Sequence, residues 1–131
     1  MAAPNPISLA SGVVPEFGPV ETIEAAAAGG FDMVGLWVEP AEWTARHTRD
    51  ARDALAATGL PLLDVEVVWL KADSSMDDHR KVIDVGAELG ARNVLCVSSD
   101  PDHARTAARL QALCEHAAPA NIRVKIGRAH V

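Results

Sequence analysis

The sequence predicts a parallel α/β fold that forms the amino-terminal half of a TIM barrel and stops early in the fifth strand. The first observation is a repeat, in which helix-like segments end at Gly30, Gly59, Gly90 and Asn121, which are 29, 31 and 31 residues apart. This is the spacing of a strand–helix unit, and strands joined by single helices form parallel sheets. The second observation is that each strand has one apolar face and one small or polar face. A central strand of an open doubly wound sheet is apolar on both faces, so the pattern favours a barrel.

The first unit begins with a strand over residues 7–10, in which Ile7 and Leu9 alternate with Ser and Ala. A loop with a proline and glycines follows. Pro19 fits the first turn of a helix because the N–H that it lacks is not needed there. Val20, Ile23 and Ala27 give that helix its apolar stripe, and Gly29 and Gly30 end it.

The second unit has a strand over residues 33–38, which Pro40 ends. A helix is expected over about 41–58, and its many Arg and Asp residues indicate a solvated face. Gly59 stops this helix. One face of the strand is apolar and the other is small or polar, with Gly35, Trp37 and Glu39 on the second face.

The third unit has a strand over residues 62–70 and a helix that Ser74 or Ser75 caps and Gly90 ends. The helix has apolar or small residues at i, i+3, i+4 and i+7, a pattern typical of a buried face: Val82, Val85, Gly86 and Leu89. In the strand, strict alternation would place Leu63, Val65 and Val67 toward the helices and Asp64 and Glu66 toward the barrel interior.

The fourth unit has a strand over residues 93–97 and a helix that starts after Ser98, Ser99 and Asp100. The expected buried stripe of this helix is Leu110, Leu113, Cys114 and Ala117. Asn121 takes the place of the usual glycine, and a fifth strand begins at Ile122.

Composition excludes several classes of function. The net charge is −6 and no Lys/Arg cluster is present, which disfavours nucleic-acid binding. No apolar run approaches the length of a membrane span, and the amino terminus lacks the features of a signal peptide. Cys96 and Cys114 are expected to be buried free thiols, which fits a cytoplasmic location.

Four segments together resemble the sugar phosphate isomerases/epimerases, which have the xylose isomerase-like barrel. The segments are Ile7-Ser-Leu-Ala10, Gly30-Phe-Asp-Met-Val-Gly-Leu-Trp37, Leu63-Asp-Val-Glu66 and Glu88-Leu-Gly-Ala-Arg92. The resemblance covers residues 6–124 and implies a barrel domain over 1–124. It also implies a divalent metal in the full-length parent protein. The ligands would come from a Glu at the end of strand five and from later strands, so we expect no metal ligand in this chain.

The last residues are different, because Ile126-Gly-Arg-Ala-His-Val131 is similar to one reading frame of a sequencing adapter. Residues 125–131 are therefore expected to be a non-native tail. On this view the native protein continues after Val124, and the chain is a fragment. We expect the fragment to be inactive, to bind no metal, and to aggregate or form a homo-oligomer, because half a barrel leaves strand edges unpaired.

The best candidate for a catalytic residue is Glu66, which lies late in strand three on the inferred inner face. Asp64 is two residues deeper and is expected to be structural. Trp37 and Glu39 are candidates for substrate binding at the end of strand two, as are Trp69 and Ser98 at the ends of strands three and four.

The resemblance implies an enzyme that moves a proton between carbons next to the carbonyl of a sugar or polyol. Two alternatives stay open. A dehydratase or lyase that acts on a keto-polyol would need similar groups on the same fold. A flavodoxin-like sheet that binds a ligand without catalysis would instead have helices on both faces.

Overall fold

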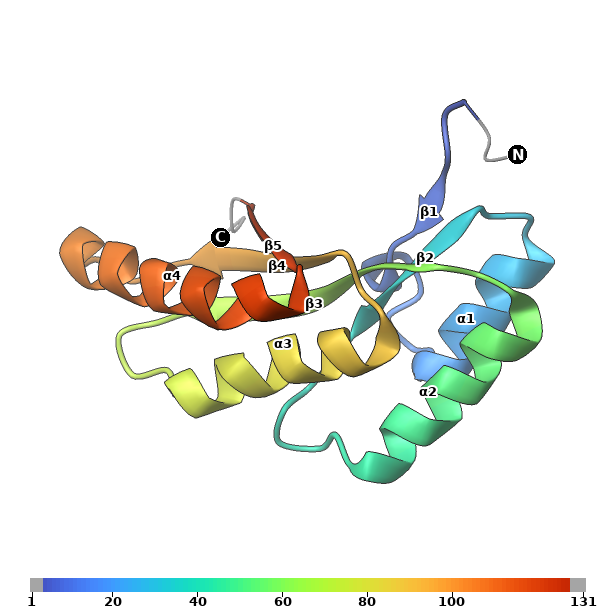
Figure 1. Cartoon of the computed structure of the whole chain (residues 1–131), viewed down its shortest axis with the longest axis horizontal. Helices are drawn as coiled ribbons and strands as arrows, with labels where there is room; N and C mark the ends of the chain where they lie inside the picture. Colours follow the sequence, from blue (N-terminus) through green and yellow to red (C-terminus); the bar gives the residue numbers. More distant parts are fainter. Residues whose placement is uncertain (1–3, 128–131) are drawn as a thin grey trace.

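The computed structural model describes residues 4–127, which form one sheet of five parallel strands with four helices (Figure 1). The strands are β1 (Ser8–Leu9), β2 (Met33–Trp37), β3 (Leu62–Leu70), β4 (Asn93–Ser98) and β5 (Arg123–Ile126). The helices are α1 (Pro19–Ala28), α2 (Ala45–Thr58), α3 (Met76–Leu89) and α4 (His103–Ala117), with short 3-10 turns η1 (Ser11–Val13) and η2 (Ala118–Ala120). Within the described part of the chain, no helix combines the length and apolar character that crossing a membrane requires.

The strands follow one another in chain order, β1-β2-β3-β4-β5, and each pairs in parallel with the next. All four helices lie on the same face of this sheet, and the other face is uncovered (Figure 1). A flavodoxin-like sheet reverses its strand order and has helices on both faces. The predicted arc of a TIM barrel is therefore confirmed, and the open doubly wound alternative is not what the chain forms.

The residues that define the repeat all have left-handed backbone conformations. The φ angles are +77° at Gly30, +72° at Gly59 and +79° at Gly90, and Asn121 has 56°. Glycine has no Cβ to clash in this conformation, and Asn tolerates it better than most other residues. The sequence-based prediction of where each helix gives way to the next strand is confirmed at these four turns.

The hydrophobic core lies between the helices and the sheet. Its most buried side chains include Ile23 from α1, Leu36 from β2 and Leu113 from α4. The predicted stripe of α3 is confirmed, since Val82, Val85, Gly86 and Leu89 are all buried. Each large side chain buried in this way contributes about 1.5–3 kcal/mol relative to exposure.

The alternation predicted for β3 is wrong in detail. Leu62, Val65, Val68 and Leu70 are the buried residues, whereas Val67 is only half-buried. The register shifts once between Val34 and Gly35 on the β2 side, and once between Val65 and Val68 on the β4 side. Each irregularity adds a residue to β3 and moves the next apolar residue back to the core face. The strand therefore buries every third residue before regular alternation resumes.

Three smaller expectations also need correction. Ile7 is 62% exposed and precedes β1, so only Leu9 brings this strand into the core. Helix α2 begins at Ala45 rather than near residue 41, because Thr44 is its N-cap. Cys114 is exposed while Cys96 is buried, since α4 buries only Leu113 and Ala117.

Strand β5 continues two residues past Val124, where Lys125 and Ile126 pair with Leu95 and Cys96 of β4. Residues 128–131, which include His130 and most of the expected non-native tail, lie outside the described residues. The boundary expected at residue 124 stays a prediction.

Candidate functional site

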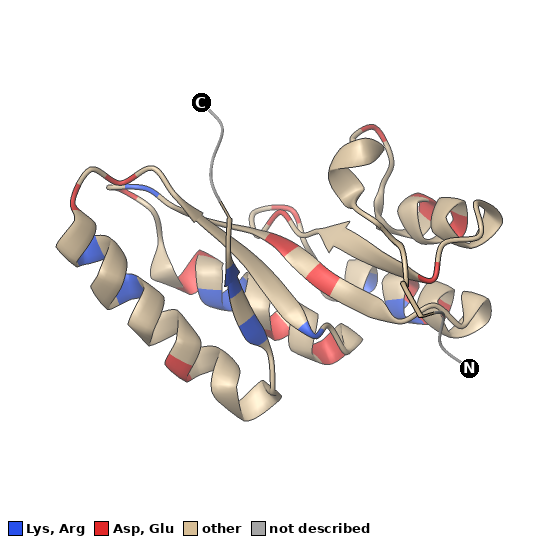
Figure 2. Cartoon of the chain, turned by 90° about the horizontal axis from the view of Figure 1, so that it is seen from above, with Lys and Arg blue, Asp and Glu red and all other residues tan. Residues whose placement is uncertain are grey.

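The inner-face carboxylates lie in the first half and middle of β3, and an open pocket lies next to them at the carboxyl ends of β1 and β2. Parallel barrels place their chemistry at this end, because the loops that follow the strands meet there. Figure 2 looks onto the uncovered face of the sheet, where acidic residues lie on β3 and basic residues lie on β5. The acidic residues of β3 are Asp64 and Glu66.

Glu66 is half-buried and is held by the loop that follows β1. The hydroxyl of Ser11, in η1, donates a hydrogen bond to Glu66 Oε1 at 2.6 Å. Trp37 is the register partner of Glu66 on β2. Because only Oε1 accepts this hydrogen bond, the carboxylate is oriented while Oε2 can still accept a proton.

Asp64 lies deeper on the same face, against the backbone of β2. An ideal Cβ on Gly35 would come within 2.2 Å of Asp64 Oδ1, so a side chain at residue 35 would occupy the position of this carboxylate. Burial raises the pKa of Asp64 above its usual value, and the negative charge of Glu66 raises it further.

Beside Ser11, the loops after β1 and β2 enclose a pocket of about 380 Å³. This volume lies within the range of small-molecule sites. The loop after β1 and the start of α1 form one wall, and the end of β2 with the loop that follows forms the other. The lining residues are Ser11, Pro15, Phe17, Gly18, Pro19, Thr22, Trp37, Glu39, Glu42, Trp43 and His47.

Two of the predicted binding residues, Trp37 and Glu39, line this pocket. The indole of Trp37 is available to a ligand, since the residue is 48% exposed. Sequence reasoning missed Glu42, Trp43 and His47, which follow Pro40 and were assigned to a solvated helix. The proline followed by a polar and aromatic turn was the available signal for a loop here.

Helix α3 holds the loop after β2 in place through hydrogen bonds from Lys81. The ammonium group of Lys81 donates hydrogen bonds to the carbonyl oxygens of Pro40 at 2.6 Å and Trp43 at 2.8 Å. The indole N–H of Trp43 donates to Thr48 Oγ1 at 2.8 Å. These contacts fix the wall of the pocket that carries Glu42 and His47.

His47 also completes the N-cap of α2. Its Nδ1 accepts a hydrogen bond from the backbone N–H of Thr44 at 3.0 Å. A neutral imidazole whose Nδ1 accepts carries its proton on Nε2, a tautomer assigned here from the hydrogen bond. The ring of His47 lies 5.4 Å from that of Trp43, centroid to centroid.

The other two predicted binding residues do not line the pocket. Trp69 donates its indole N–H to Ser99 Oγ at 2.9 Å, and the ammonium group of Lys71 lies 4.6 Å from the centroid of the Trp69 ring. Ser98 Oγ lies 2.9 Å from Thr106 Oγ1 and accepts the backbone N–H of Asp100. A role for Trp69 or Ser98 in binding stays a prediction, and Ser99 is the residue that contacts Trp69.

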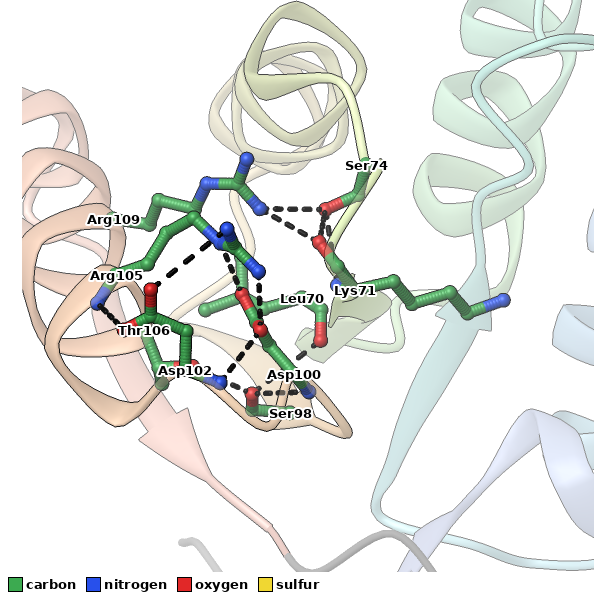
Figure 3. A network of polar contacts seen from close by, with 9 residues as sticks. All are labelled: Leu70, Lys71, Ser74, Ser98, Asp100, Asp102, Arg105, Thr106 and Arg109. Atoms are coloured by element: carbon green, nitrogen blue, oxygen red, sulfur yellow. Dashed lines mark hydrogen bonds and ion pairs between the residues drawn. The ribbon is translucent and has the colours of Figure 1, made fainter.

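Ser98 belongs to a polar network that joins the loops after β3 and β4 (Figure 3). At its centre the fully buried carboxylate of Asp100 accepts two hydrogen bonds from Arg105, each at 2.6 Å. The guanidinium of Arg105 lowers the pKa of Asp100 to about 2. Arg109 donates to the carbonyl oxygen of Lys71 at 2.7 Å and so connects α4 to the loop after β3.

The residues 4–127 do not fit a metal site. They contain no group of three or more His, Cys, Asp or Glu side chains that could hold a metal ion.

His79 is buried on α3, and its Nε2 has no hydrogen-bond partner among the described residues. Burial lowers the pKa of His79, the charge of Asp78 opposes this shift, and Arg109 adds to it.

Comparison with solved structures confirms the fold of the barrel. A sugar phosphate isomerase/epimerase from Parabacteroides distasonis ATCC 8503 has a TM-score of 0.67 at 14% identity, over 97% of this chain and 52% of that one. A xylose isomerase-like TIM barrel/4-hydroxyphenylpyruvate dioxygenase fusion protein has a TM-score of 0.69 at 24% identity, over 92% of this chain and 21% of that one. The protein SMc04130 from Sinorhizobium meliloti 1021 has a TM-score of 0.64 at 20% identity, over 92% and 49% of the two chains.

Identities this low show the fold alone. The chain spans about half the length of the sugar phosphate isomerase/epimerase and of the Sinorhizobium protein. No model of a known protein family matches the sequence, and no curated protein matches it either.

Proposed function

We propose that this chain supplies the first half of the barrel of a sugar or sugar phosphate isomerase/epimerase, in which Glu66 moves a proton at the carbon next to a carbonyl. The observation that carries the proposal is the carboxylate of Glu66, oriented by Ser11 at 2.6 Å beside a pocket that Trp37 and Glu39 line. A general base of this kind needs a defined orientation and reach to the substrate.

The roles of the pocket residues follow from their chemistry. Trp37 would stack on the sugar ring, and Glu39 would accept hydrogen bonds from its hydroxyl groups. Asp64 would stay structural, beneath Glu66. Burial raises the pKa of Asp64, and the charge of Glu66 raises it further, as expected for a carboxyl group enclosed beneath a second one.

A divalent metal stays part of the proposal for the longer protein only. Since the described residues form no metal site, no proton transfer is routed through a metal here. The remaining strands of a complete barrel would contribute the ligands. The chain by itself is therefore proposed to be inactive, and the proposed compartment is the cytoplasm.

The test is proton exchange in the complete barrel protein with added divalent metal. In D₂O, an isomerase or epimerase incorporates deuterium at the carbon next to the carbonyl of a ketose, which NMR detects. Substituting Glu66→Gln keeps the shape but removes the base, and should lower the exchange rate by about 100-fold or more. Exchange that continues at the wild-type rate in this variant would exclude Glu66 as the base.

A dehydratase or lyase on a keto-polyol would use the same carboxylate to remove the proton. The same NMR experiment separates the two reactions, because loss of water removes a hydroxyl group from the product whereas isomerisation keeps every atom.

A further inference from the structure

We propose that the pocket between the loops after β1 and β2 binds the unphosphorylated, hydroxyl-bearing end of a neutral sugar or polyol, and that it rejects phosphate esters. The inference rests on the proposed function, because it assumes that the ligand of this pocket is the substrate of the proposed isomerase or epimerase. It concerns the charge of the ligand, which the fold comparison leaves open.

The charges that line the pocket are negative. Glu39 and Glu42 contribute carboxylates, and none of the described residues that line the pocket is Lys or Arg. Two carboxylates at one pocket repel a phosphate dianion, and because Glu39 and Glu42 are both exposed, salt screens this repulsion. A hydroxyl group, in contrast, can donate a hydrogen bond to either carboxylate.

Three cations near the carboxyl ends of the strands are held by hydrogen bonds outside the pocket, and a fourth, Lys71, places its ammonium group against the Trp69 ring. The ammonium group of Lys81 is bound to the carbonyl oxygens of Pro40 and Trp43. At the mouth of the barrel, Arg105 is paired with Asp100, and Arg109 donates to the carbonyl of Lys71. To reach a phosphate in the pocket, these side chains would have to give up hydrogen bonds of 2.6 to 2.8 Å.

The remaining lining groups fit a hydroxylated ring. The indole of Trp37 offers an apolar face, and Nε2 of His47 carries a proton to donate. Thr22 also lines the pocket but is buried, and its hydroxyl donates to the carbonyl oxygen of Gly18, so the acceptors that a ligand meets are the carboxylates of Glu39 and Glu42. Donors and acceptors thus surround one flat apolar surface, an arrangement that matches a sugar ring.

The experiment compares D-fructose with D-fructose 6-phosphate on the intact 131-residue chain. Titrations follow the three indole N–H signals by NMR, because each tryptophan reports separately. We expect D-fructose to shift the Trp37 signal, with a dissociation constant at least about tenfold below that of the phosphate ester. Raising the salt concentration should narrow this difference, because it screens the repulsion.

Variants assign the discrimination to the pocket. The double substitution Glu39→Gln/Glu42→Gln should reduce the preference for D-fructose by about tenfold. The matched control Glu24→Gln/Glu115→Gln removes the same charge from exposed residues outside the pocket and should leave the preference unchanged. If the pocket variant does not fold, the salt series on the unmodified chain tests the same repulsion: the preference for D-fructose should decrease as the salt concentration rises.

The inference is overturned if the phosphate ester binds as tightly as D-fructose, or if neither compound shifts the Trp37 signal up to its solubility limit. It is also overturned if both double variants change the preference equally. These results are separate from the proposed function. Binding of D-fructose without deuterium exchange in the complete protein would count against the reaction only, and exchange with phosphate esters alone would count against this pocket assignment only.

Discussion

The contact between Gly35 and the carboxylate of Asp64 makes a quantitative prediction. Gly35 does not have a positive φ, so alanine fits its backbone. An alanine Cβ would lie 2.2 Å from Asp64 Oδ1, and the next nearest atoms are Asp64 Cγ at 3.4 Å and the backbone oxygen at 3.7 Å. The clash is therefore with the carboxylate alone. Displacing it should lower the free energy of unfolding by about 1–3 kcal/mol.

Removing the carboxylate should reverse the sign of this effect. In the Asp64→Ala background the clash is gone, and Gly35→Ala should stabilise the chain by about 0.5–1 kcal/mol through the lower entropy of the unfolded state. The coupling energy of the double-mutant cycle is then about 1.5–4 kcal/mol. Urea denaturation followed by circular dichroism measures all four variants.

The control for this cycle is Gly12→Ala. No heavy atom lies within 4 Å of an ideal Cβ on Gly12, so its effect should be the same with and without the Asp64 carboxylate. A coupling energy between residues 35 and 64 below about 0.5 kcal/mol would refute the placement of the Asp64 carboxylate, which belongs to β3, against Gly35 of β2.

Three further outcomes test the supports of the site. The pKa of Asp100 is lowered to about 2 in the folded state, so between about pH 4 and 2 the unfolded chain binds more protons than the folded chain. The free energy of unfolding should therefore decrease as the pH is lowered through this window, and it should decrease less in Asp100→Asn. The pKa of His79 is lowered, so the unfolded chain also takes up its proton first as pH falls below about 6.5; acid urea titrations should show a loss of stability there that His79→Leu removes. Lys81→Met should cost about 2 kcal/mol and shift the Trp43 indole signal, whereas an unchanged signal would mean that Lys81 does not hold the loop.

The parts of the site that follow a regular strand could be predicted from the sequence. Trp37 is the last residue of β2 and Glu39 follows it by two residues, and both line the pocket as predicted. Glu42 and Trp43 were missed because the helical pattern after Pro40 was extended over a turn, and His47 was missed because the pattern of α2 does not show which of its residues meets the pocket. That turn is held by Lys81, which lies 38 residues beyond Trp43 in the chain. No local pattern contains a hydrogen bond of such long range.

The bulges of β3 are a second case. Alternation of Leu63, Val65 and Val67 is a local argument, and it assumes that the neighbouring strands keep one register. The structure breaks the register on both sides of β3, so Val68 takes the buried position. Whether an added residue lowers the free energy depends on the packing of β2 and β4, which the sequence of β3 does not contain.

The sequence by itself determined the repeat, the order of the elements and the turns at Gly30, Gly59, Gly90 and Asn121. These depend on backbone conformation and on periodicity, which are properties of residues close together in the chain. The tertiary structure decided which carboxylate is oriented by Ser11, which one lies over Gly35, and where the pocket opens. These depend on side chains from different strand–helix units, whose distances are set only when the sheet curves and the helices cover one face.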